Sequence, residues 1–314
     1  MGSDPLLAAV PQRGPRGEDS GVAERAGVNE AGAEPVGEAP WAPVVPAPGP
    51  LPSTAFLDGV SRVEARVFVE TGSAPAAGLC GSVGVGAMLT NGSTRFGPSE
   101  VHRAVVFGAG AQESLPPLPG GLTYLGRSAR GSRPEDVRSE VERLREEREA
   151  TLAARLAEEG WVVIADGRLR WAEPMEVIGY IKSHHGRYLG PDLEPVVPAL
   201  AAGERTPLFA LARSHHYSWY LRLTDGSRGH PWAGVARCEV SASLPVSRVV
   251  ELADMTARHL PRFASLGFWD TRSPQNLVPI ATLERRLWHL LGDRDLVLRR
   301  IRSAISRVGE DARA

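Results

Sequence analysis

Hydrophobic and polar positions follow two periods along the chain from residue 52 onward. Residues 62–69 alternate polar and apolar side chains, which is typical of a strand with one wet face. Apolar or β-branched runs predict further strands at residues 78–90, 104–107, 161–165, 177–182, 207–212, 217–223 and 232–240. Apolar residues at helical spacing predict helices over residues 134–159, 246–264, 283–291 and 293–308. This order of elements predicts an α/β fold, a mixed β-sheet flanked by helices.

The predicted helix over residues 134–159 has recognisable ends. Ser132 lies near its cap, Pro134 begins it, and acidic residues follow in the first turn. Gly160 suits a C-terminal cap. The next residues form a β-branched strand, so the helix leads the chain directly into a strand that ends at Asp166.

Asp-Gly pairs follow two of the apolar runs. We expect Asp58-Gly59, after Phe56, to form a tight turn before an antiparallel partner strand, and Asp166-Gly167 ends the later strand. Two such strands side by side would bring two carboxylates within reach of one hard metal ion. An Asp-Gly pair is also a common turn after a strand, and each copy alone favours that interpretation.

Residues 1–51 are rich in Pro, Gly, Ala and Glu, and Trp41 is their single aromatic residue. A segment of this composition buries too little apolar surface to offset its ordering entropy. The composition therefore predicts a disordered N-terminal tail followed by one domain over residues 52–314. We expect that removal of residues 1–50 leaves folding and activity largely intact.

Charge and cysteine content narrow the class of protein. The 314 residues include 36 Lys+Arg against 37 Asp+Glu, which argues against a polycation but not against a local basic groove. Two cysteines, Cys80 and Cys238, are too few for a disulfide framework, and their spacing fits no zinc motif. No apolar run suits a membrane helix and no signal-peptide pattern begins the chain, so a soluble cytoplasmic protein is expected.

A two-ion site needs more carboxylates than the two aspartates supply. The middle of the helix before Asp166 carries a run of glutamates, Glu140, Glu142, Glu146, Glu147 and Glu149. A charge run of this kind is usually a solvated helix face. Glu149 borders the apolar face that includes Leu152 and Leu156, so it is the glutamate best placed to turn inward.

The order and spacing of four short motifs resemble the NurA nuclease family. These motifs are Phe-Leu-Asp-Gly at 56–59, Val-Ile-Ala-Asp-Gly-Arg-Leu at 163–169, Gly-Tyr-Ile-Lys-Ser at 179–183, and Gln-Asn-Leu-Val-Pro-Ile-Ala-Thr-Leu-Glu at 275–284. The acidic helix precedes the second motif, and the resemblance covers roughly residues 54–308.

The resemblance implies an RNase H-like core with 5′-to-3′ exonuclease and single-strand endonuclease activity that depends on Mn²⁺ or Mg²⁺. It also implies a homodimer that acts on DNA, in end processing or repair, together with a hexameric HerA-type ATPase. By position it makes Asp58, Glu149 and Asp166 metal ligands. Where NurA proteins have a tyrosine and then a histidine, this chain has Asn276 and Glu284. Glu284 can still donate an oxygen, so the expected metal ligands are these three acids and Glu284.

Lys182 is the only lysine in the chain, and two interpretations of it stay open. It either holds the scissile phosphate as a point charge or is an ordinary surface lysine at a strand end. The pairs His184-His185 and His215-His216 lack zinc-type spacing and are interpreted as loop residues near DNA or solvent.

Three functions are consistent with these patterns. The leading hypothesis is a metal-dependent deoxyribonuclease in which Asp58, Asp166 and Lys182 are catalytic. The second is a catalytically silent module that binds DNA or the ATPase, because the C-terminal motif has changed. The third is another RNase H-like nuclease, from a mobile element or a defence system. Convergence of the four acids would favour an enzyme.

Overall fold

A computed structural model describes residues 7–10, 32–71, 74–108, 110–170, 175–184, 186, 188–211, 215–225, 230–265 and 274–311. The strands are β1 Leu7–Val10, β2 Ala33–Pro35, β3 Thr54–Thr71, β4 Ala74–Asn91, β5 Ser93–Phe107, β6 Leu125–Ser128, β7 Val162–Asp166, β8 Val177–Ile181, β9 Phe209–Leu211, β10 His216–Arg222 and β11 Val235–Ser241. The helices are α1 Pro134–Glu158, α2 Val196–Ala199, α3 Val246–His259, α4 Val278–Leu290 and α5 Arg294–Asp311, and the 3₁₀ helix η1 Leu260–Phe263 follows α3.

One mixed sheet joins the described strands. Its order is β2-β9-β10-β11-β8-β7-β3-β4-β5-β6, and β1 pairs with β3 outside this path. The pairs β3–β7, β7–β8 and β5–β6 are parallel, whereas the other neighbours are antiparallel. The predicted α/β class, a mixed sheet flanked by helices, is therefore confirmed.

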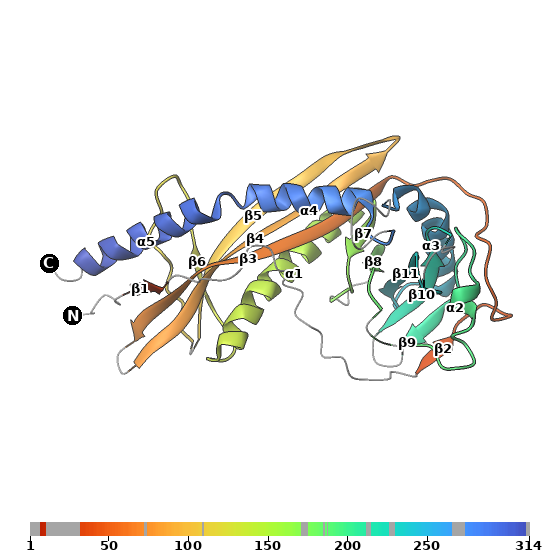
Figure 1. The fold of residues 1–314 in the computed structure, drawn as a ribbon, viewed down its shortest axis with the longest axis horizontal. Coiled ribbons are helices and arrows are strands. Elements are labelled where there is room, and N and C mark those ends of the chain that lie inside the picture. The colour runs from red at the N-terminus through yellow and green to blue at the C-terminus, as the bar shows by residue number, and fades with distance from the viewer. Residues whose placement is uncertain are drawn as a thin grey trace.

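Helices cover both faces of the sheet (Figure 1). On one face, Leu144 and Leu152 of α1 pack in a core with Leu57 of β3 and Ala165 of β7. On the other face, a separate core joins residues of α3 and α4 to Phe56 and its neighbours on β7 and β8. Helix α5 continues beyond α4 along the long strands and packs against their outer parts. The middle of the sheet, where β3 meets β7, is thus covered from both sides.

Strand β3 differs from the prediction at Asp58-Gly59. The sequence predicted a tight turn there, but β3 runs unbroken from Thr54 to Thr71, and Gly59 is paired with Val85 of β4. Gly167, in the second Asp-Gly pair, does have a positive φ of 92° and ends β7 as a turn. A glycine permits a turn without requiring one, and the long ladder with β4 keeps residue 59 extended.

The boundaries of two other elements differ from the prediction because of nearby prolines. Pro261 ends α3 early, so the predicted helix over 246–264 becomes α3 followed by η1. Helix α4 begins at Val278 rather than 283, because Pro279 stands in its first turn, where a proline is compatible with a helix. Strand β6 is not among the strands that the hydrophobic pattern predicts.

Residues 32–51 lie against the body of the protein, whereas the sequence predicted a disordered tail. Strand β2 pairs with β9, and the indole Nε1 of Trp41 donates to the carbonyl oxygen of Leu193 at 2.9 Å. The Glu38 carboxylate pairs with the buried Arg205 guanidinium at 2.7 Å. Specific polar partners therefore hold a segment that buries little apolar surface. Residues 1–6 and 11–31, which also belong to the predicted tail, are outside the described residues.

Candidate active site

Two carboxylates meet where β3 and β7 run parallel. Leu57 pairs with Ala165, so Asp58 and Asp166 follow at the next register position. Asp166 in turn pairs with Tyr180 of β8. Paired residues of neighbouring strands share a face, and Phe56, Ile164 and Tyr180 all lie in the core beneath α4. Asp58 and Asp166 therefore project from the α4 side of the sheet.

Asp58 is a buried carboxyl group, 8% exposed, in an acidic surrounding. Its Oδ1 accepts a hydrogen bond from the backbone N–H of Gly59 at 2.8 Å. Burial raises its pKa well above the ordinary range, and the charge of Asp166 raises it further. Lys182 lowers the pKa, whereas Glu149 and Glu284 raise it. The charges of the other three predicted acids and of the lysine thus all act on Asp58.

Lys182 lies directly beside Asp166. Its Nζ donates to Oδ2 of Asp166 at 2.7 Å and to Oδ1 of the buried Asn276 at 3.2 Å. The other carboxylate oxygen, Oδ1 of Asp166, is buried and has no hydrogen-bond partner among the described residues. A buried acceptor without a partner is costly, and a cation at this position would satisfy it.

Glu149 approaches the same region from α1, on the opposite face of the sheet. Its Oε1 accepts a hydrogen bond from Arg145 Nη1 at 2.6 Å. A Cβ placed on Gly59 would come within 2.3 Å of that Oε1, so the missing side chain of Gly59 is what lets the glutamate reach the strand. Burial raises the pKa of Glu149 to about 7, although Arg145 opposes that rise. The charge of Asp166 raises the pKa of Glu149 further, so the two carboxylates interact although they project from opposite faces of the sheet.

Glu284 belongs to α4 and is half-buried. Its neighbour Leu283, together with Ile280 and Leu287, packs into the core under the helix. The charge of Glu284 raises the pKa of Asp58, so the two carboxylates are within electrostatic range.

The donor chemistry fits a hard divalent cation. Carboxylate oxygens are the ligands that Mg²⁺ and Mn²⁺ prefer, and the buried Asp166 Oδ1 is an acceptor that such an ion would satisfy. In the described part of the chain, no three His, Cys, Asp or Glu side chains are already close enough to hold a metal ion. Instead, Lys182 and Arg145 neutralise Asp166 and Glu149. A bound metal ion would therefore displace Lys182 and Arg145 from these carboxylates or share the carboxylates with them.

Three of the residues around the acids were not assigned a role from the sequence. Arg145 pairs with both Glu149 and Glu142, and Glu142 accepts a hydrogen bond from Ser61 Oγ at 2.6 Å. Gly59 makes room for Glu149, and Asn276 orients Lys182. The i, i+4 spacing of Arg145 and Glu149 could have predicted their ion pair. Contacts between distant segments, such as Lys182 with Asn276, leave no such signal.

Three members of the two histidine pairs belong to the described residues. His184 Nε2 bonds the carbonyl oxygen of Val235 at 2.8 Å, beyond the end of β8. His216 lies in β10, and burial lowers its pKa. His215 is exposed. His185 is outside the described residues.

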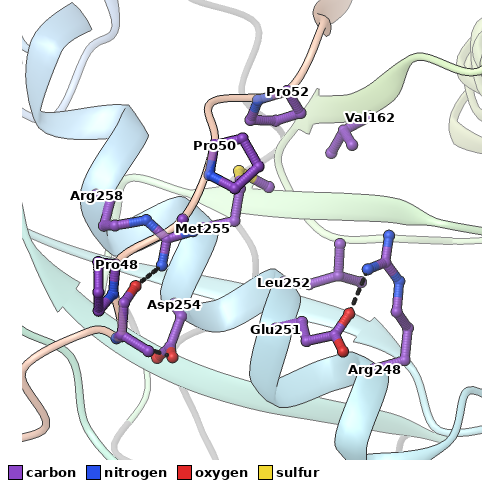
Figure 2. Close-up of a pocket in the computed structure, with 12 residues that line it drawn as sticks. Pro48, Pro50, Pro52, Val162, Arg248, Glu251, Leu252, Asp254, Met255 and Arg258 are labelled. Carbon is purple, nitrogen blue, oxygen red and sulfur yellow. Dashed lines mark hydrogen bonds and ion pairs between the residues drawn. The ribbon is translucent and has the colours of Figure 1, made fainter.

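A cavity of about 360 Å³ lies between residues 47–52 and α3 (Figure 2). Arg258 donates to the carbonyl oxygen of Ala47 across it, and Arg248 pairs with Glu251 on its wall. Val162, the first residue of β7, also lines this cavity, whereas Asp166 is the last residue of that strand. The cavity is therefore at the opposite end of β7 from the carboxylates.

Among the described residues, no helix is both long and apolar enough to cross a bilayer. No protein-family profile and no curated protein match the chain. A search of solved structures finds the NurA nuclease from Sulfolobus solfataricus, at 14% sequence identity and a TM-score of 0.44. That similarity covers 80% of this chain and 86% of the other.

Proposed function

We propose that this chain is a metal-dependent deoxyribonuclease that hydrolyses phosphodiester bonds. The observation that carries the proposal is the placement of Asp58 and Asp166 on adjacent parallel strands, with Lys182 at 2.7 Å from Asp166. A buried carboxylate, a half-buried one and a cation at a strand end match the needs of phosphoryl transfer, which depends on positioning and on stabilising negative charge.

In this proposal, Asp58 and Asp166 hold one or two Mn²⁺ or Mg²⁺ ions, and Glu149 and Glu284 complete the ligands. When bound, the metal supplies an activated water and stabilises charge on the attacked phosphate. The chain's own residues position that chemistry. Lys182, held by Asn276 beside Asp166, would present its ammonium group to the scissile phosphate.

The test is cleavage of single- and double-stranded DNA with Mn²⁺, Mg²⁺ or chelator. Asp58→Asn and Asp166→Asn should each lower the cleavage rate by at least a hundredfold, because an amide keeps the shape but loses the charge. The matched control is Asp295→Asn, an exposed aspartate on α5, which should cut like the wild type. Wild-type rates in both site variants would contradict the proposal. Full activity of Glu284→Gln would remove only Glu284 from the ligands.

A second candidate is a catalytically silent module that binds DNA or an ATPase. The observation that favours it is the neutralisation of Asp166 and Glu149 by Lys182 and Arg145. A silent module would bind DNA equally well in chelator and in Mn²⁺, and would not cut it in either. Cleavage that requires metal would exclude this function.

The finer details of the proposal follow the sequence resemblance. They are 5′-to-3′ exonuclease and single-strand endonuclease activity, a preference for manganese, and a role in DNA end processing or repair with a HerA-type hexameric ATPase in the cytoplasm. A homodimer is also proposed. Exposed apolar side chains on β5, α4 and α5, such as Phe96, Trp288 and Leu296, support a self-association surface.

A further inference from the structure

A second cavity, of about 430 Å³, is lined in part by residues that are close in the chain to Lys182 and Asn276. Its wall includes His184 and Gln275. His184 is two residues beyond Lys182, and Gln275 directly precedes Asn276, the partner of Lys182. The cavity and the proposed phosphate site therefore share two chain segments. Its volume falls within the roughly 300–1,000 Å³ of ordinary small-ligand pockets.

One side of this cavity is aromatic and held in place. The ring of His184 lies 5.1 Å from that of Trp232, centroid to centroid, and Trp232 stands edge-on to Tyr220 at 5.3 Å. Phe209 stacks behind Tyr220 at 5.6 Å. The bond from His184 to the carbonyl oxygen of Val235 fixes the imidazole further. A half-buried tryptophan on a rigid backing is a stacking platform for a flat ring.

The polar side chains of the wall are those of Glu194, Gln275, His184 and His230, and the acidic one disfavours a phosphate. Glu194 contributes a carboxylate, which repels an anion but accepts hydrogen bonds from an amino group. Gln275 contributes a side-chain amide, and its own carbonyl oxygen accepts the Tyr180 hydroxyl at 2.7 Å, so its backbone is anchored to β8. The occupant that suits this wall is flat, uncharged and able to donate hydrogen bonds.

We infer that this cavity binds an unpaired nucleobase with an exocyclic amino group, from a single strand whose backbone lies at the acidic cluster. Stacking on Trp232 provides affinity, and Glu194 and Gln275 prefer cytosine, adenine or guanine over thymine. A base inside a duplex is not available to such a cavity. The inference rests on the proposed function, because that function places the phosphate beside Lys182.

The test measures binding without cleavage. Labelled ten-nucleotide strands of deoxycytidine, of thymidine and of abasic deoxyribose phosphate are titrated against the full chain in chelator, with fluorescence anisotropy as the readout. Deoxycytidine should bind about tenfold more tightly than the abasic strand, since stacking of one base on an aromatic side chain contributes that much or more. Thymidine should fall between the two.

Three variants assign the effect to the cavity. Trp232→Ala should bind the deoxycytidine and abasic strands alike, and Trp232→Phe should keep most of the difference. Glu194→Gln should reduce the preference for deoxycytidine over thymidine. The control is Trp161→Ala, which removes a half-buried tryptophan before β7, at the end of that strand away from Asp166, and should leave the base dependence unchanged. Melting curves identify any variant that fails to fold, and Gln275→Ala then provides a second substitution in the same wall.

Three outcomes would overturn the inference: equal binding of abasic and deoxycytidine strands, base dependence that survives Trp232→Ala, or no binding of single strands at micromolar concentration. None of these requires catalysis. If single-strand binding does not depend on the base but DNA is still cut in the presence of metal, only the inference fails and the proposed function stands. Base-dependent binding without any cutting would leave the cavity assigned and the nuclease proposal refuted.

Discussion

Glu149 can approach β3 from α1 because residue 59 has no side chain. The space that a Cβ would occupy at Gly59 is taken by Glu149 Oε1, at 2.3 Å, and by Arg145 Cγ, at 3.1 Å. These atoms belong to flexible side chains, so an added methyl group would push the carboxylate aside rather than break the sheet. Glycine here sets the position of a charge, not the geometry of a turn.

Gly59→Ala should therefore lower cleavage at least tenfold while reducing the free energy of unfolding by only about 1 kcal/mol. Gly84→Ala is the matched control, because Gly84 pairs with Val60 in the same ladder and its added methyl meets apolar side chains. The assay is cleavage in Mn²⁺ together with urea unfolding. Equal activity of the two variants would show that Glu149 is not needed where the structure places it.

Glu149 also predicts a pH dependence of stability. Its pKa is raised to about 7, chiefly by burial, above the ordinary 4.5 that the unfolded chain has. The folded state therefore binds the proton more tightly, and the free energy of unfolding falls as pH rises from about 4.5 to about 7.

In chelator, the wild type should lose up to about 3 kcal/mol relative to Glu149→Gln between pH 4 and pH 8, at 1.36 kcal/mol per pKa unit. Glu135→Gln, at an exposed position on α1, should follow the wild type. Urea unfolding at a series of pH values measures the difference. A constant difference between wild type and Glu149→Gln would mean that this carboxyl group titrates normally.

At the scale of elements, residues 32–51 form a segment held by polar contacts. The Arg205 side chain is 1% exposed and pairs with Glu38 and with Asp254 of α3. The same Asp254 accepts the backbone N–H of Ala47 at 3.1 Å. One buried guanidinium thus ties the segment to the sheet and to α3.

Glu38→Ala should lower the free energy of unfolding by about 2–4 kcal/mol, because it leaves a buried arginine with one of its two acidic partners. Glu34→Ala, at an exposed position on β2, is the control and should stay within about 0.5 kcal/mol of the wild type. Thermal or urea melts give both values. If the two variants melt together, the segment is not part of the folded unit, as the sequence composition had suggested.

At the scale of the whole molecule, the long strands β3, β4 and β5 extend beyond the core with α4 and α5 along them (Figure 1). Large apolar side chains stay exposed there, including Phe96 at 49% and Trp288 at 39%. The Arg286 guanidinium lies 5.3 Å from the Phe96 ring centroid, so β5 and α4 form one continuous surface. A second copy of the chain is the proposed partner for it.

Light scattering at micromolar concentration should give twice the 33.6 kDa chain mass. Phe96→Ser and Trp288→Ser should each weaken the dimer at least tenfold, because they remove apolar area from the proposed interface. Val45→Ser, which changes a side chain 75% exposed on the N-terminal segment, is the control. A monomeric wild type would contradict the homodimer.

The sequence by itself determined the elements and the identity of the charged side chains. The spacing of hydrophobic positions predicted α1, β7 and β8. The apolar run before Asp166 predicted a strand that ends in a carboxylate. These features depend on neighbours within a few residues, so a local pattern contains them. Lys182 stood out because no other lysine occurs in the chain.

Tertiary structure alone decided which charges from distant segments meet. The parallel register of β3 and β7 brings Asp58 beside Asp166 across more than 100 residues of chain, and the ladder with β4 keeps Gly59 extended rather than turned. Arg205 orders a segment whose composition predicts disorder. Pairings between distant segments are chosen by the free energy of the whole fold, and no short stretch of sequence contains that information.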